Sequence, residues 1–203
     1  MTERILQKAT ELFITLGFKS VTMDDIASNL GISKKTLYKH FSNKTELVDE
    51  TTNHMFSIIS LGIDEICASD LNPIAEIFEI KNLMMRHLKD EKSSPQYQLQ
   101  RYYPNIFSSL KKKQFKKMQE CTIENIKKGK EQGLYRADLD IDFVTRIYFI
   151  GAMGIKDKDY FPLKDFSMST LTNYFLEYHL RGICSEKGII ELQKQLEKNK
   201  TTN

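Results

Sequence analysis

The sequence has few of the residues that build disulfide scaffolds, metal fingers or tightly kinked loops. Its 203 residues include three cysteines, four prolines and no tryptophan. Cys67, Cys121 and Cys184 are widely separated in the chain, which gives neither a C-x-x-C metal motif nor an even disulfide framework. We therefore expect no metal or other cofactor, and a reducing cytoplasm as the compartment.

Long apolar runs are also missing. The chain contains no stretch of about eighteen apolar residues, the length that a membrane-spanning helix needs. Its N-terminal segment is amphipathic and charged and lacks the apolar core of a signal peptide. These absences predict a soluble cytoplasmic protein without a membrane partner. Because the net charge is only +3 at pH 7, binding to a polyanion would depend on where positive charges gather.

The chain does contain a succession of helical patterns, without a convincing run of alternating β-branched residues. Its composition, 40% hydrophobic and 28% charged, is that of an ordinary globular chain. The pairs Asn72–Pro73 and Ser94–Pro95 each predict a helix start, because a capping side chain directly precedes a proline. Pro104 predicts either a kink or another start. The predicted fold class is all-α, with about nine helices.

A helix-turn-helix pattern lies near the N-terminus. Thr22 stands three residues before Asp25, which is the capping-box spacing of a helix start. Gly31 follows the apolar residues of that helix, where a left-handed cap is expected. Ser33 is placed to cap a second helix over residues 34–41. The turn between the two helices has the length typical of this motif.

The second of these helices carries only positive charges. Four lysines and no acidic residue lie between Gly31 and Thr45. Leu37 and Phe41 are four residues apart and face inward. The outward arc then holds Lys35, Thr36, Tyr38 and Lys39. Cations in a first helical turn oppose the macrodipole by about 0.3–1 kcal/mol each, so stability alone does not favour this arrangement. DNA phosphates would relieve the conflict; the alternative is a solvated helix face.

The neighbouring patterns complete a small domain. An apolar stripe that ends at Gly17 predicts a helix on which the motif can pack. Asn43 and Glu46 form another cap-like pair and open a fourth helix that leaves the motif. We therefore divide the chain into a DNA-binding domain over residues 1–46 and a helical domain over residues 47–203.

The segment from Ala9 to Leu47 resembles the N-terminal DNA-binding domain of TetR-family transcriptional regulators. The shared motifs are FxxxGF from Phe13, T-x-x-x-I-A from Thr22, G-[VI]-S from Gly31, and T-L-Y-x-[HY]-F-x-[NS]-K ending at Lys44. A short turn from Tyr135 to Leu139 is similar to one common in the C-terminal domains of the family. The resemblance implies a homodimer with a small-molecule effector in its C-terminal domain. It also implies that DNA is contacted by Thr22, Lys34, Lys35, Thr36, Tyr38, Lys39, His40 and Lys44.

Flexible and aromatic apolar side chains are dense between Ile74 and Leu110. Most of them must fill the core, since methionine and aromatic residues are usual in helix packing. Others can line an apolar cavity with a few polar groups, as small-molecule sites do. The candidate pocket residues are Phe78, Met84, Met85, His87, Tyr102, Tyr103, Phe107 and Tyr148.

Two downstream helices are more apolar than a single core requires. The segment 143–155 is apolar nearly all round, and the next helix repeats apolar residues at three- and four-residue steps. Two such helices from each chain can pair as a four-helix bundle. The candidate interface residues are Ile147, Gly151, Gly154, Leu171, Tyr174, Phe175 and Tyr178. A dimer would read a palindromic operator with half-sites about 34 Å, or a multiple, apart.

An enzyme and a protein-binding adaptor are the alternatives to a transcriptional regulator. An enzyme is disfavoured, because no H-E-x-x-H, G-x-S-x-G or phosphate-cradling motif occurs. A protein-binding adaptor that uses the fold without DNA stays open. A second group of lysines, from Lys111 to Lys130, is interpreted as a solvated face; the alternative is a further contact to DNA or to an acidic partner. The expected function is a ligand-responsive transcriptional regulator, a repressor that a small molecule releases from double-stranded DNA.

Overall fold

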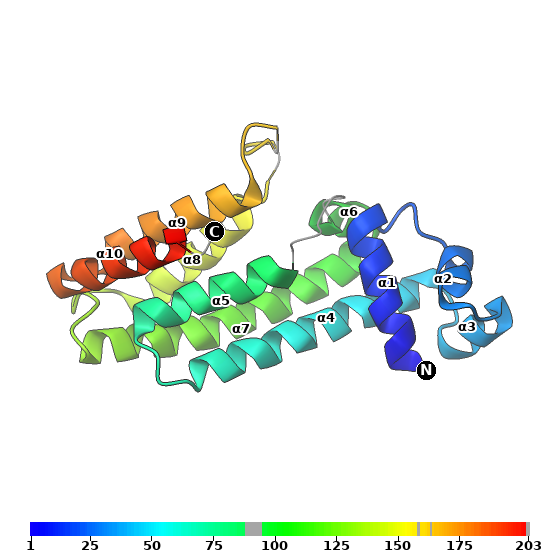
Figure 1. Cartoon of the computed structure of the whole chain (residues 1–203), viewed down its shortest axis with the longest axis horizontal. Helices are drawn as coiled ribbons and strands as arrows, with labels where there is room; N and C mark the ends of the chain where they lie inside the picture. The colour runs from blue at the N-terminus through cyan, green and yellow to red at the C-terminus, as the bar shows by residue number, and fades with distance from the viewer. Residues whose placement is uncertain (88–94, 158, 163, 202–203) are drawn as a thin grey trace. The chain divides into compact units, whose positions relative to one another are not determined.

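The structure is a computed structural model that describes residues 1–87, 95–157, 159–162 and 164–201. Within these ranges the chain forms ten helices and no strand, which confirms the all-α prediction (Figure 1). The helices are α1 (Thr2–Leu16), α2 (Met23–Leu30), α3 (Lys34–His40), α4 (Lys44–Cys67), α5 (Pro73–His87), α6 (Pro95–Tyr102), α7 (Pro104–Glu131), α8 (Ile141–Gly154), α9 (Met168–Ile183) and α10 (Glu186–Thr201).

The predicted helix starts at prolines are confirmed. The side-chain oxygen of Asn72 accepts hydrogen bonds from the backbone N–H groups of Ile74 and Ala75, at 3.1 and 2.9 Å, and α5 begins at Pro73. Helix α6 begins at Pro95, while Ser94 lies outside the described residues. Pro104 starts α7, so it separates two helices and does not kink one.

Helix α10 is the one that the sequence did not predict. It follows α9 after a single extended residue, Cys184, and Ser185 then caps it by accepting a hydrogen bond from the Gly188 N–H at 3.1 Å. Neither proline nor a left-handed glycine marks this break. Leu192 of α10 is fully buried, so tertiary packing on the neighbouring helices stabilises a helix with a weak local start signal.

The described helices form two compact units. Unit 1 contains Met1–Gly62 and Arg86–Gln114, and unit 2 contains Ile63–Met85 and Phe115–Asn203. Helices α4 and α7 therefore each contribute residues to both units. The core of unit 1 joins α1–α3 to the start of α4 and to Leu99 of α6. Its most deeply buried members include Ile5, Ala9, Phe13, Ile26, Leu37 and Leu47.

Unit 2 has its own apolar core, which contains Ile74, Ile126, Leu180 and Leu192. A buried hydrogen-bond chain crosses this core. The Tyr135 hydroxyl donates to the Asn125 side-chain oxygen at 3.0 Å, and the Asn125 amide donates to the Glu76 carboxylate at 2.7 Å. Lys128 balances the charge of Glu76 at 3.5 Å. Satisfied polar groups of this kind fix one arrangement of the helices that supply them.

Among the described residues, none of the helices combines the length and the apolar character that crossing a membrane would require.

Candidate DNA-binding surface

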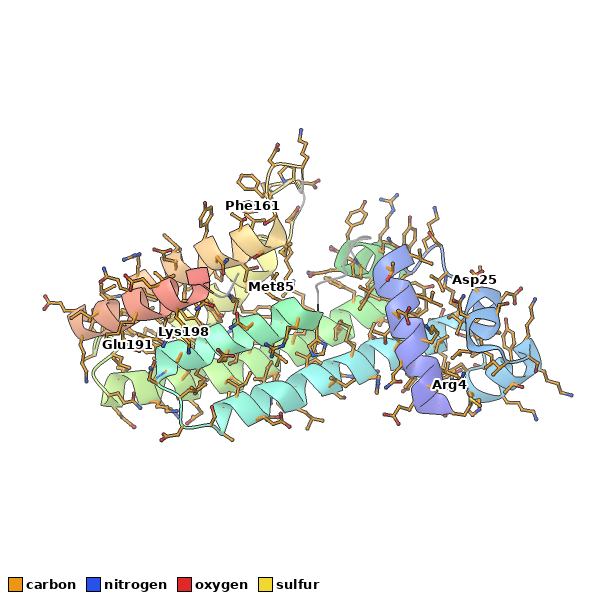
Figure 2. The ribbon with its side chains drawn as sticks, viewed as in Figure 1. Arg4, Asp25, Met85, Phe161, Glu191 and Lys198 are labelled. Carbon is orange, nitrogen blue, oxygen red and sulfur yellow. The ribbon has the colours of Figure 1, made fainter. Side chains whose placement is uncertain are left out.

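Helix α2 begins and ends as its sequence predicts. The Thr22 hydroxyl oxygen accepts a hydrogen bond from the Asp25 N–H at 3.1 Å, and an Asp25 carboxylate oxygen accepts from the Thr22 N–H at 2.8 Å. The Thr22 hydroxyl donates to the same carboxylate oxygen at 2.7 Å, and this bond, with the one from the Thr22 N–H, holds the pKa of the Asp25 carboxyl below its usual value. Gly31 closes the helix with a φ of 66°, the left-handed region that glycine adopts without strain. Asp25 is labelled beside α2 in Figure 2.

Helix α3 is short and has a capped start. The Ser33 side chain accepts a hydrogen bond from the Thr36 N–H at 3.1 Å. Leu37 is fully buried, and Phe41, the residue that ends the helix, is almost as deeply buried. These two anchors fix which face of α3 points outward, and they confirm the predicted inward pair.

The outward face of α3 is basic and exposed. Lys34, Lys35 and Lys39 are exposed, and Tyr38 keeps 48% of its surface open. Lys34 forms an ion pair with Asp24 of α2, which offsets part of the unfavourable interaction with the helix N-terminus. In the described part of the chain, Lys35 and Lys39 have no ion pair or hydrogen bond. Their charges are therefore free to meet an anionic partner.

Three more predicted contact residues border this face. Thr36 is half-buried, and its hydroxyl lies 2.8 Å from that of Ser33. His40 is exposed, with its Nδ1 atom 3.2 Å from the Thr2 hydroxyl. The Lys44 ammonium donates to the Lys19 carbonyl at 3.3 Å. Partial burial lowers the pKa of Lys44, while the nearby Asp25 carboxylate opposes that shift.

The structure also places polar groups at the start of α4. The Asn43 side-chain oxygen accepts from the Glu46 N–H at 2.9 Å, as the cap-like pair predicted. The Glu46 carboxylate accepts from the Ser42 N–H at 2.7 Å and from the Ser42 hydroxyl, and these bonds lower the pKa of Glu46. Ser42 was not predicted from the sequence. Its two bonds to Glu46 fix the backbone between α3 and α4.

The second group of lysines is mostly paired. Lys113 donates to the Asn53 side chain at 2.7 Å, Lys117 contacts Asp64, and Lys127 contacts Glu124 at 2.8 Å. Lys128 and Lys130 also have acceptors, in Glu76 and in the Leu139 carbonyl. This pattern favours a solvated, internally balanced face over a second DNA contact.

The candidate pocket residues are divided between the two units. Phe78 is part of the core of unit 2, and Tyr148 stacks there on Phe175 with ring centroids 5.7 Å apart. Tyr103 and Phe107 pack against the core of unit 1. Of the remaining candidates, Met84 and Met85 are half-buried and Tyr102 is exposed. Core packing accounts for much of this set, and its role in ligand binding stays a prediction.

A cavity of about 170 Å³ lies within unit 1. Of the predicted pocket residues, only His87 contributes to its wall. The Nε2 atom of His54, another wall residue, is buried without a hydrogen-bond partner among the described residues. The lining residues are Gln7, Thr10, Ile14, His54, Met55, Ile58 and His87. This cavity could not be predicted from the sequence, because its walls come from segments that only the tertiary structure brings together.

Helices α8 and α9 pack side by side and leave an apolar outer face. Of the predicted interface residues, Ile147, Gly154, Tyr174 and Tyr178 are exposed, the last two at 66% and 80%. Phe143 and Ile150 extend the patch and were not singled out from the sequence. Their exposure is notable because large apolar side chains gathered on one face mark an interaction surface.

The other three predicted interface residues are occupied by packing within the protomer. Leu171 is only 4% exposed. Phe175 packs on Tyr148, and a Cβ atom added to Gly151 would lie 2.2 Å from the Phe175 ring. The glycine therefore allows α8 and α9 of one chain to approach closely, which is a role within the protomer.

A capped helix-turn-helix with an exposed basic second helix, joined to an all-helical body, defines a DNA-binding transcriptional regulator. Residues 5–51 match the family model described as bacterial regulatory proteins, tetR family. Over this segment the chain is similar to the DNA-binding domain of TetR-family transcriptional regulators.

Relatives of known name extend the similarity to most of the chain. The HTH-type transcriptional repressor KstR2 of Mycobacterium tuberculosis strain H37Rv is 25% identical over 185 residues, which cover 90% of this chain and 92% of the relative. The solved structure of KstR2 from M. tuberculosis has a TM-score of 0.56 at 23% identity and covers 91% and 95% of the two chains. A transcriptional regulator from Cytophaga hutchinsonii has a TM-score of 0.71 at 20% identity, over 90% and 98%. These structures share the fold.

Proposed function

We propose that the protein is a repressor that binds a palindromic operator as a homodimer and is released by a small molecule. The observation that carries the proposal is the exposed basic face of α3, whose Lys35 and Lys39 have no partner in the described part of the chain. The relative KstR2 is named as a transcriptional repressor, and IcaR of Staphylococcus epidermidis, which is 33% identical over 28% of this chain, is named as a negative transcriptional regulator. These names support repression over activation. The DNA-binding domain in this proposal spans residues 1–46, with residues 47–203 as the effector and dimerisation domain.

The proposed DNA contacts come from three places. Lys35, Tyr38 and Lys39 project from α3 toward the major groove, where lysine can reach guanine or phosphate. The N-terminus of α2 and the start of α4 contact the phosphates on either side. The full set is Thr22, Lys34, Lys35, Thr36, Tyr38, Lys39, His40 and Lys44.

The homodimer is proposed on the exposed apolar face of α8 and α9. Phe143, Ile147 and Ile150 on α8 and Tyr174 and Tyr178 on α9 are large apolar side chains open to solvent. Their burial against a second copy would remove this surface from water, at about 25 cal/mol for each Å². A twofold axis through this contact gives two copies of α3, as a palindrome requires.

The effector is proposed to be an apolar small molecule with one or two polar groups. The solved relatives include a ketosteroid transcriptional regulator and a complex of the repressor SmeT with triclosan. In this chain, the methionine- and aromatic-rich segment of α5–α7 has the composition that such molecules contact. Binding there would shift α4, which starts four residues after α3 ends, with a coupling of about 1–3 kcal/mol. A regulator of this kind acts on the chromosome in the cytoplasm and catalyses no reaction.

The experiment selects operator DNA from a random library with the full-length protein and then measures affinity by fluorescence anisotropy. The double variant Lys35→Glu and Lys39→Glu should lose specific binding, because it places two negative charges against phosphate. Lys116→Glu is the matched control, since Lys116 is exposed in the second lysine group, and it should bind as the unmodified chain does. Equal loss in both variants, or no selected sequence at all, would contradict the proposal.

A further inference from the structure

Two of the three cysteines lie opposite each other on different helices of unit 2. Cys67 is the last residue of α4, and Cys121 lies within α7. An ion pair between Asp64 and Lys117 joins the same two helices one turn earlier on each. Because residues three or four apart share a helix face, this ion pair sets a register in which the two thiols meet.

The thiols are within hydrogen-bonding reach of each other, and their environments differ. The Cys67 thiol donates toward Cys121, which lowers the pKa of Cys121 and raises that of Cys67. The Lys117 ammonium also favours the thiolate of Cys121. Cys67 stands at the C-terminal end of α4, where the helix dipole disfavours a negative charge. Cys121 is therefore the more nucleophilic of the two.

Access and surroundings fit a reactive pair. Both sulfurs belong to half-buried residues, whereas Cys184 is buried, and burial raises its pKa to about 11. In the part of the chain that the structure describes, no three histidine, cysteine or acidic side chains gather as a metal site would need. Half-burial and the proximity of the two thiols are the conditions that oxidation to a disulfide requires.

We propose that Cys67 and Cys121 form a reversible disulfide on exposure to peroxides, and that this bond ties α4 to α7. The Cys121 thiol loses its proton, and its sulfur bonds to one peroxide oxygen as the O–O bond breaks. The other oxygen leaves as hydroxide and takes up that proton. The Cys67 sulfur then displaces the hydroxyl group of the Cys121 sulfenic acid, which leaves with the Cys67 proton as water. In total, two thiols and one hydrogen peroxide give one disulfide and two waters.

The test uses the reduced full-length protein and a small excess of hydrogen peroxide, followed by alkylation of the remaining thiols. Trypsin separates the cysteines into the peptides 45–81, 118–127 and 182–187, so mass spectrometry identifies each linkage. We expect a link between 45–81 and 118–127, an alkylated Cys184, and a fall in titratable thiols from three to one. Dithiothreitol should restore all three. No DNA is needed, so the result does not depend on the proposed function.

Single variants separate the two roles. Cys67→Ser should stop the reaction at a Cys121 sulfenic acid that dimedone traps, and Cys121→Ser should leave Cys67 as a thiol. Cys184→Ser is the matched control and should form the cross-link at the unmodified rate. The proposal is overturned if native protein keeps its three thiols under peroxide that oxidises the urea-unfolded chain. Links that involve Cys184, or that join different chains, would overturn it equally.

Discussion

Single side chains set the close packing of unit 2. Gly129 of α7 lies against the Tyr135 ring, and a Cβ atom built on it would be 2.0 Å from the ring. Tyr135 is buried and its hydroxyl is held by Asn125, so the ring has little freedom to move. Nothing in the local sequence around Gly129 reveals the ring that packs on it.

Gly129→Ala should therefore lower the free energy of unfolding by about 1–3 kcal/mol through overpacking. Gly182→Ala is the matched control, because Gly182 is also helical and a Cβ atom there meets nothing within 4 Å. That change should be neutral or stabilising by up to about 1 kcal/mol. Urea denaturation measures both, and an unchanged midpoint for Gly129→Ala would show that the Tyr135 ring can yield.

His179 should make stability depend on pH. Its ring lies against that of Tyr148, with centroids 4.5 Å apart, and burial lowers the pKa of His179 to about 4. Between pH 6.5 and 4, His179 is then protonated in the unfolded chain, where its pKa is near 6.5, but stays neutral in the folded chain. The contribution of His179 to the free energy of unfolding is therefore fully present above pH 6.5. It is lost as the pH falls to 4, which lowers the free energy of unfolding by up to about 3 kcal/mol.

Urea denaturation from pH 7 to pH 4 measures this loss. His179→Phe removes the titrating group while keeping a ring against Tyr148, so its stability should fall less over the same window. The carboxyls of Asp25, Glu46 and Asp142, whose pKa values are lowered, lose their contributions only at more acidic pH. Parallel pH profiles for the two proteins would refute the role given to His179.

At the scale of helices, local signals explain most of what could be predicted. The starts of α2, α3 and α5 follow from a capping side chain at a fixed spacing, which needs no tertiary information. Helix α10 was missed because its start lacks those signals and its stability comes from Leu192 packing in the core of unit 2. The cavity beside His54 was missed for the same reason. The spacing of residues along the sequence predicts local hydrogen bonds but does not reveal contacts between distant segments.

The capping box of α2 gives a prediction at this scale. Thr22→Ala removes the acceptor for the Asp25 N–H and should lower the free energy of unfolding by about 1 kcal/mol. Thr22→Ser should retain it, because serine offers the same oxygen. Thr45→Ala in the exposed first turn of α4 is the control and should have little effect. Thermal unfolding followed by circular dichroism compares the three variants.

At the scale of the whole molecule, operator binding should depend on the apolar face of α8 and α9. The double variant Tyr174→Glu and Tyr178→Glu places charges in the proposed interface and should give a monomer in sedimentation equilibrium. With about four phosphate contacts for each half-site, the slope of log affinity against log salt should change from about −7 to about −3.5.

Tyr160→Glu is the matched control for that experiment. Tyr160 is equally exposed but lies outside α8 and α9, so its variant should stay dimeric and keep the steeper salt dependence. A dimeric double variant would place the interface elsewhere on the chain.

The continuity of α4 has a mechanical consequence. Its 24 residues make a rod of about 36 Å that starts beside the DNA-binding motif and ends at Cys67. A tilt of about 5° in such a rod displaces one end relative to the other by about 3 Å. That displacement is close to the spacing of stacked base pairs, about 3.4 Å. A tilt of a few degrees at one end of α4 would thus move its other end by about the distance between two neighbouring base pairs.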